Sequence, residues 1–102
     1  MVPEIVGRGR QTTPVIRRKV LVQGHVQGVF FRESIRSRAT AVGVAGWARN
    51  LPDGSIEVVL EGAPEAVESV VAFCQEGPRG ARVDWVDVAG EQPEALTGFT
   101  VA

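Results

Sequence analysis

The spacing of apolar residues, which changes between helix and strand periods along the chain, most constrains what it can fold into. Residues 31–42 carry apolar side chains at positions 31, 35, 39 and 42, which form one stripe on a helix. Residues 64–75 carry a second stripe, with a proline at the first helical position and Gly77-Pro78 after the last. The sequence therefore predicts two amphipathic helices, the first ending before the capping residue Gly43.

Strand-like runs surround these helices. We interpret residues 17–23, 44–51, 55–61 and 82–88 as strands and 97–101 as a short last one. Pro52-Asp53-Gly54 supplies the turn of a β-hairpin between the second and third strands. The order β-α-β-β-α-β predicts an α+β ferredoxin-like sandwich, an antiparallel sheet with two helices on one face. In that arrangement Asn50, which ends the second strand, lies near the loop that leaves the first.

The ends of the chain differ in charge and composition. We expect residues 1–15, which lack apolar periodicity, to form a flexible tail and residues 16–102 to form one domain. Residues 1–19 carry five arginine or lysine residues and one glutamate, although the whole chain has a net charge of −1. The basic head could contact nucleic acid, but a solvated tail is the simpler interpretation. The acidic remainder argues against a nucleic-acid-binding body.

Composition also bears on compartment and cofactors. The single cysteine, Cys74, cannot form an internal disulfide, which suits a reducing compartment, and we expect a cytoplasmic monomer. No apolar run approaches the roughly 18 residues that a membrane span needs, and the N-terminus lacks an apolar signal core. One cysteine and one histidine cannot build a zinc site, so we expect no metal and no cofactor.

The segment from Gly24 to Arg32 runs from a predicted strand into a predicted helix. Its glycines let backbone N–H groups converge, and the helix N-terminus adds unpaired donors and a positive dipole end. Arg32 adds a planar fork of donors that fits phosphate oxygens. The same pattern also fits a glycine turn followed by a solvated arginine, because glycine loops are weak signals in isolation.

Two longer motifs carry a resemblance to a known family. The segment VQGHVQGVFFR, residues 22–32, resembles the first signature of acylphosphatases, and GWARNLPDG, residues 46–54, resembles the second. The resemblance implies a ferredoxin-like fold and metal-independent hydrolysis of acyl phosphates to a carboxylate and inorganic phosphate. It also implies that Arg32 binds the phosphate and that Asn50 positions the water. The implied phosphate cradle is made of the backbone N–H groups of Val26, Gln27, Gly28, Val29, Phe30 and Phe31.

Several residues depart from the family pattern or invite another role. His25 stands where a basic residue such as arginine is common, and we interpret it as an electrostatic helper rather than a general base. Cys74 lies on the second helical stripe and is expected to be an inert buried thiol. Glu57 and Glu61 share one strand face, which we interpret as solvated or paired with a helix. Trp47 is expected to pack rather than to stack on a substrate.

Two other functions remain open from the sequence. A non-catalytic module that binds phosphate or acyl phosphate could use the same scaffold, although both Arg32 and Asn50 are present. An RNA-binding domain has the same element order, but such domains stack bases on aromatic residues of the first and third strands. The predicted first and third strands contain no aromatic residue, which counts against that alternative.

Overall fold

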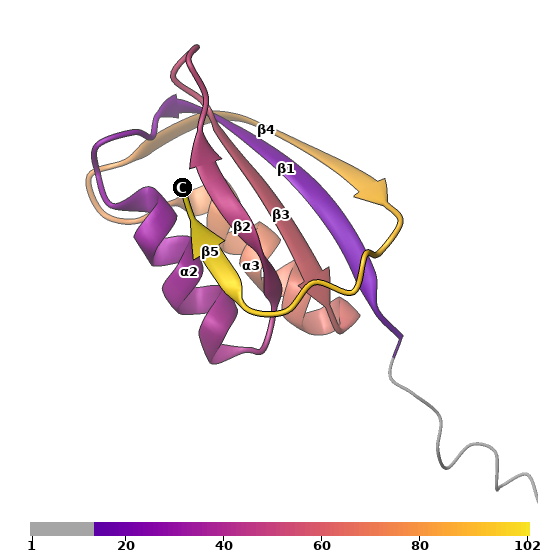
Figure 1. The fold of residues 1–102 in the computed structure, drawn as a ribbon. Helices are drawn as coiled ribbons and strands as arrows, with labels where there is room; N and C mark the ends of the chain where they lie inside the picture. The colour runs from indigo at the N-terminus through magenta and orange to yellow at the C-terminus, as the bar shows by residue number, and fades with distance from the viewer. Residues whose placement is uncertain (1–13) are drawn as a thin grey trace, which may run out of the picture.

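The computed structural model describes residues 14–102, and the expected tail, residues 1–15, lies almost entirely outside them. Two helices and five strands follow one another along this part of the chain (Figure 1). They are β1 (Ile16–His25), α2 (Phe31–Ala41), β2 (Ala45–Asn50), β3 (Ile56–Gly62), α3 (Pro64–Glu76), β4 (Arg82–Glu91) and β5 (Phe99–Val101).

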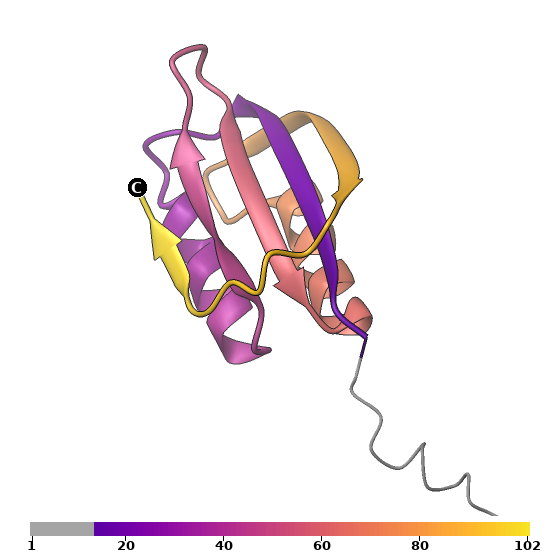
Figure 2. The same ribbon diagram turned by 45° about the vertical axis from the view of Figure 1, so that its right-hand side comes forward.

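The strands form one sheet in the order β4-β1-β3-β2-β5. β1 pairs antiparallel with β3 and β4, and β2 pairs antiparallel with β3, so β1 and β2 run in the same direction on either side of β3. β5 alone departs from the predicted antiparallel sheet, because it pairs parallel with β2. Both helices cover the same face of the sheet (Figures 1 and 2), which confirms the α+β ferredoxin-like sandwich.

The core lies between the helices and the covered face of the sheet. The predicted helical stripes fill it, with the exception of Val42, which is exposed because α2 ends at Ala41. The rings of Phe31 and Phe73 join the two helices, with centroids 6.2 Å apart. The other buried side chains include Val20, Val22, Ile35, Ala39, Ile56, Val58, Leu60, Val67, Val70, Val71 and Cys74. No helix among the described residues is long and apolar enough to cross a membrane.

Two predicted strand ends were wrong for identifiable reasons. β1 continues through Gly24 to His25, because Gly24 takes φ 139° at an irregularity in the ladder instead of ending the strand. An added Cβ at Gly24 would lie 2.2 Å from the Arg82 carbonyl oxygen, so the close approach to β4 requires glycine. β4 extends to Glu91, since its last residues pair with the beginning of β1 although they lack the apolar alternation of a strand.

The face of the sheet opposite the helices carries buried charges. Glu57 and Glu61 on β3 are 7% and 3% exposed, so the interpretation of a solvated or helix-paired face was wrong. The Glu57 carboxylate forms ion pairs with Lys19 Nζ at 3.0 Å and with Arg49 Nη2 at 2.7 Å. Burial alone would raise the pKa of Glu57, but the hydrogen bonds and charges of these two cations outweigh it and hold the pKa below its usual value.

Candidate active site

The loop between β1 and α2 has a backbone shape that suits an anion. Gly28 and Phe30 are left-handed, with φ 77° and 60°, and Val29 between them is not. An alternation of this kind can turn successive N–H groups towards one side, which is the concave arrangement that binds anions. Ser34 donates to the Phe30 carbonyl at 3.0 Å as the helix begins, and no side chain caps the N-terminus of α2 within the described chain. The first N–H groups of α2 therefore face outward, towards the loop.

A cavity of about 300 Å³ opens beside this loop. Arg32, in the first turn of α2, and Asn50, at the end of β2, both line it. The remaining lining residues are Val26, Gly28, Phe30, Phe31 and Glu33. The parallel course of β1 and β2 explains this meeting, because their carboxyl ends lie at the same edge of the sheet.

The Arg32 guanidinium contacts the end of the described chain. Its Nη1 donates to the backbone oxygen of Ala102, just beyond β5. Ala102 is itself held by β2, because its N–H donates to the Ala48 carbonyl at 3.0 Å. This contact uses Nη1, and the guanidinium has further N–H donors that suit phosphate oxygens. This contact joins residues 70 positions apart, and no local pattern in the sequence points to it.

The loop is also fastened to the β2–β3 hairpin. Gln27 Nε2 donates to the carbonyl oxygens of Leu51 and Ser55, both at 2.9 Å. Leu51 N–H donates in turn to the Ser55 carbonyl at 2.8 Å. Because Leu51 follows Asn50 directly, the Gln27 side chain holds the two motifs in a fixed relation. The side chain therefore fastens the loop, a role that sequence reasoning missed.

The hairpin turn beyond Asn50 is closed by side-chain contacts. Asp53 Oδ1 accepts from the Ser55 hydroxyl at 2.6 Å and from the Ser55 N–H at 2.9 Å. These bonds hold the pKa of Asp53 below its usual value, with the hydroxyl contact contributing most. An ionised Asp53 thus braces the turn that follows Asn50, and the turn itself lies where the Pro52-Asp53-Gly54 pattern predicts it.

The predicted site residues do not all lie in the same place. Val26, Gly28, Phe30, Phe31, Arg32 and Asn50 line one cavity, whereas Gln27 and Val29 are not part of its lining. Val29 packs against the core. Glu33 lines the cavity without having been predicted, and its carboxylate pairs with Arg36 at 3.2 Å. An acidic residue in the first helical turn was the available signal, since it suits the helix dipole.

The other residues that the sequence analysis discussed lie outside the cavity lining. His25 is exposed at the end of β1, paired with Arg82 of β4, and is not part of the cavity lining. Cys74 is fully buried, and burial raises the pKa of its thiol to about 12, as expected for an inert thiol. Trp47 is partly exposed, with the Arg49 guanidinium 5.0 Å from the centre of its ring. Among residues 14–102, no three His, Cys, Asp or Glu side chains converge as metal ligands.

The fold is that of the ferredoxin-like α+β proteins, and the cavity has the donors that a phosphate-handling protein needs. The acylphosphatase family model matches residues 18–101. An acylphosphatase from Rubrobacter xylanophilus is 55% identical over 90% of this chain and 82% of its own length. One from Gloeobacter violaceus is 51% identical over 84% of this chain and 92% of its own. An acylphosphatase structure from Coxiella burnetii superposes with a TM-score of 0.82 at 35% identity, covering 86% of this chain and 93% of its own.

The chain therefore belongs to the acylphosphatase family. It is an enzyme of that class, which implies acyl phosphates as substrates and phosphate as a product. The resemblance that the two sequence motifs suggested is confirmed over nearly the whole described domain.

Proposed function

We propose that this enzyme hydrolyses acyl phosphates without a metal, with Arg32 holding the phosphoryl group and Asn50 positioning the attacking water. The observation that carries the proposal is that both side chains line one cavity at the uncapped N-terminus of α2. The backbone N–H groups of residues 26–31 complete the cradle. A phosphoryl group placed there is held by the helix dipole, by the loop donors and by the guanidinium fork.

The reaction breaks the bond between phosphorus and the bridging oxygen, and water supplies the new oxygen on phosphorus. The leaving group is a carboxylate, which is stable without protonation, so the protein need not supply an acid. Neutralising the charge on the phosphoryl oxygens and aligning the water are the remaining tasks. Arg32 and the N–H cradle are suited to the first task. A metal would duplicate this neutralisation, which is why we propose metal independence.

Asn50 is suited to the second task. Its amide oxygen can accept a hydrogen bond from water, but an amide is not basic and cannot take the proton. We assign the proton to an oxygen of the substrate's own phosphoryl group. Phosphate then leaves as the hydrogen-bonded product. His25 has no step in this scheme because it does not line the cavity.

The proposed division of labour is tested by comparing Asn50→Ala with Arg32→Ala. Arg32 holds the phosphoryl group in both the ground and the transition states, so its loss removes phosphate binding and nearly all turnover. Arg32→Lys restores little, since a point charge lacks the fork geometry. Asn50→Ala lowers kcat on the order of 100-fold, but its affinity for inorganic phosphate stays within about threefold of wild type.

Both variants are first shown to be folded by near-UV circular dichroism. A folded Asn50→Ala variant with wild-type kcat would show that Asn50 does not position the water. Loss of phosphate affinity as severe as in Arg32→Ala would assign it to binding instead. A wild-type protein that binds phosphate but hydrolyses no acyl phosphate would favour the alternative of a non-catalytic binding module. The cytoplasmic location, the monomeric state and the absence of nucleic-acid binding stay predictions from the sequence.

A further inference from the structure

The segment that connects β4 to β5 crosses the sheet before it reaches the site. After Glu91 the chain runs past the ends of β1 and β3 and joins β2 on the far side (Figures 1 and 2). We call residues 92–98 the crossover segment. It contains no helix or strand, and it leads into β5, after which Ala102 contacts Arg32.

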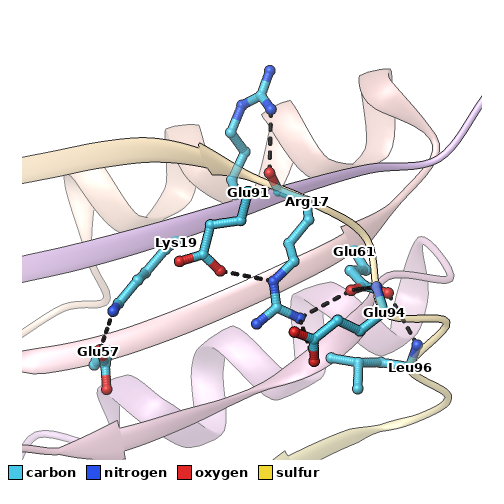
Figure 3. A network of polar contacts seen from close by, with 8 residues as sticks. Arg17, Lys19, Glu57, Glu61, Glu91, Glu94 and Leu96 are labelled. Atoms are coloured by element: carbon cyan, nitrogen blue, oxygen red, sulfur yellow. Dashed lines mark hydrogen bonds and ion pairs between the residues drawn. The ribbon is translucent and has the colours of Figure 1, made fainter.

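A buried carboxylate holds the middle of this segment. Glu61 of β3 accepts the N–H of Glu94 at 2.6 Å and the N–H of Leu96 at 3.0 Å, one with each carboxylate oxygen (Figure 3). The residue is 3% exposed. A buried carboxylate needs such partners, because an unpaired charge out of water is costly. Two backbone donors on one carboxylate therefore fix both the position and the course of the crossover segment.

Arg17 of β1 holds the same region, and we call Glu61 and Arg17 together the clamp. Its Nη1 donates to Glu61 at 2.9 Å, and its Nε donates to Glu91 at 2.8 Å, where β4 ends. The Nη1 also lies 3.7 Å from the Glu94 carboxylate (Figure 3). One guanidinium thus joins the strand before the crossover segment, the segment itself and the carboxylate beneath it. Arg17 is 7% exposed and the Glu61 side chain is buried as well, so water screens the contact between these two residues little.

The contacts that connect the clamp with Arg32 are made almost entirely by backbone groups. Gly46 N–H donates to the Gly98 carbonyl at 2.9 Å, where the crossover segment ends. β5 then pairs with β2 from Phe99 to Val101, and Ala102 continues the same ladder before accepting from Arg32. The crossover segment is the covalent link from β4 to β5, and it enters β5 next to the Gly46–Gly98 bond, so we expect its position to influence how firmly β5 is held on β2.

We infer that Glu61 and Arg17 are positioning residues for the phosphate-binding Arg32, and that they act through the crossover segment and β5. Neither residue lines the cavity. The inference rests on the proposed role of Arg32 in phosphate binding. It predicts that loosening the clamp weakens phosphate binding although no group that touches phosphate has changed.

The chain offers a matched control in Glu57. It lies on the same strand and the same face as Glu61, is 7% exposed and is also held by two cations, Arg49 and Lys19, of which Figure 3 shows Lys19. The hydrogen bonds of its carboxylate go to those side chains and not to the crossover segment. Glu57→Gln and Glu61→Gln therefore remove the same charge from similar surroundings, and only the second variant removes contacts to the crossover segment.

The experiment measures the dissociation constant for inorganic phosphate by calorimetry, together with KM and kcat for acetyl phosphate. We expect Glu61→Gln to raise the phosphate Kd and KM about fivefold, with kcat changed less than about twofold. Glu57→Gln changes the phosphate Kd less than about twofold. Removing a negative charge would by itself favour an anion, so the expected weakening in Glu61→Gln opposes the overall charge effect.

Amide hydrogen exchange at Ala102 gives a second reading. It should become faster in Glu61→Gln and remain at the wild-type rate in Glu57→Gln. If Glu61→Gln does not fold, Glu61→Asp replaces it, because the side chain keeps the charge but, one methylene shorter, no longer reaches the N–H groups of Glu94 and Leu96. A phosphate Kd within about twofold of wild type in the Glu61 variant overturns the inference, and so does an equal loss in Glu57→Gln.

The two proposals fail in different ways. A wild-type protein without acyl phosphate hydrolysis would contradict the proposed function, but the comparison of phosphate Kd values would still test the clamp. Normal hydrolysis with equal phosphate Kd values in the two variants would contradict the clamp alone.

Discussion

Replacing Phe30 by glycine tests whether the anion loop is held in a strained shape. Phe30 has φ 60° and ψ 25°, and its side chain is 81% exposed. A left-handed backbone costs a residue with a Cβ roughly 1–2 kcal/mol. Glycine removes that cost, but its greater freedom in the unfolded chain takes back about 0.5–1 kcal/mol. Because the ring is largely exposed, little packing is lost.

Phe30→Gly should therefore raise the free energy of unfolding by about 0.5–1 kcal/mol. For a domain of this size the corresponding rise in Tm is roughly 2–8 °C. The assay is thermal and urea denaturation followed by circular dichroism, with unchanged m-values as evidence that the unfolding transition is the same.

Two other positions serve as controls. Ala95 has φ 57° and is exposed in the crossover segment, so Ala95→Gly should give a similar gain without touching the cavity. Gly28 has φ 77°, and an added Cβ would meet no atom within 4 Å. Gly28→Ala should therefore lose about 1 kcal/mol through backbone strain alone. If Phe30→Gly lowers Tm while Ala95→Gly raises it, the ring contributes packing that outweighs the strain, and the reasoning is wrong.

Four further outcomes follow from the same structure. Gly46→Ala should cost roughly 2–4 kcal/mol in thermal melts, because the new Cβ would lie 1.8 Å from the Val59 carbonyl oxygen at φ 146°. The depressed pKa of Glu61 gives stability that is present above its ordinary value of 4.5 and lost as pH falls below it. Urea melts between pH 3 and 7 should show this loss in wild type and a shallower slope in Glu61→Gln. Exhaustive chelation should leave the hydrolysis rate unchanged, and a loss restored by magnesium or zinc would contradict metal independence. Deleting residues 1–15 should change Tm and kcat/KM little.

The pH dependence expected for Glu61 follows from the contacts that shift its pKa. Burial raises the pKa of the carboxyl, but the N–H groups of Leu96 and Glu94 and the guanidinium of Arg17 together outweigh burial and lower it. The folded state thus binds this proton less readily than the unfolded chain does. Protonation at low pH therefore favours unfolding.

The helices and the meeting of the two motifs were predictable from the sequence. The apolar stripes of α2 and α3 fixed which faces pack, and the element order required β1 and β2 to run in parallel. That parallel course is what brings Asn50 to the loop before Arg32. The spacing of apolar residues and the order of helices and strands can both be determined from a single sequence.

The contacts that fasten the site were not predictable in the same way. Gln27 reaches carbonyl groups 24 and 28 residues away, and Arg32 reaches one 70 residues away. Such bonds depend on side-chain direction in the folded chain, and no spacing rule encodes them. Glu61 was misjudged for a related reason: alternation along β3 shows which residues share a face, but not that the crossover segment covers it.

The central claim is tested most directly by the release of inorganic phosphate from acetyl phosphate, corrected for spontaneous hydrolysis, with wild type and Arg32→Ala measured side by side. Wild type should accelerate the release, and folded Arg32→Ala should lose at least about 100-fold of that acceleration, the scale of a lost contact to developing charge. No acceleration by wild type, or an equal rate in Arg32→Ala, would contradict the account.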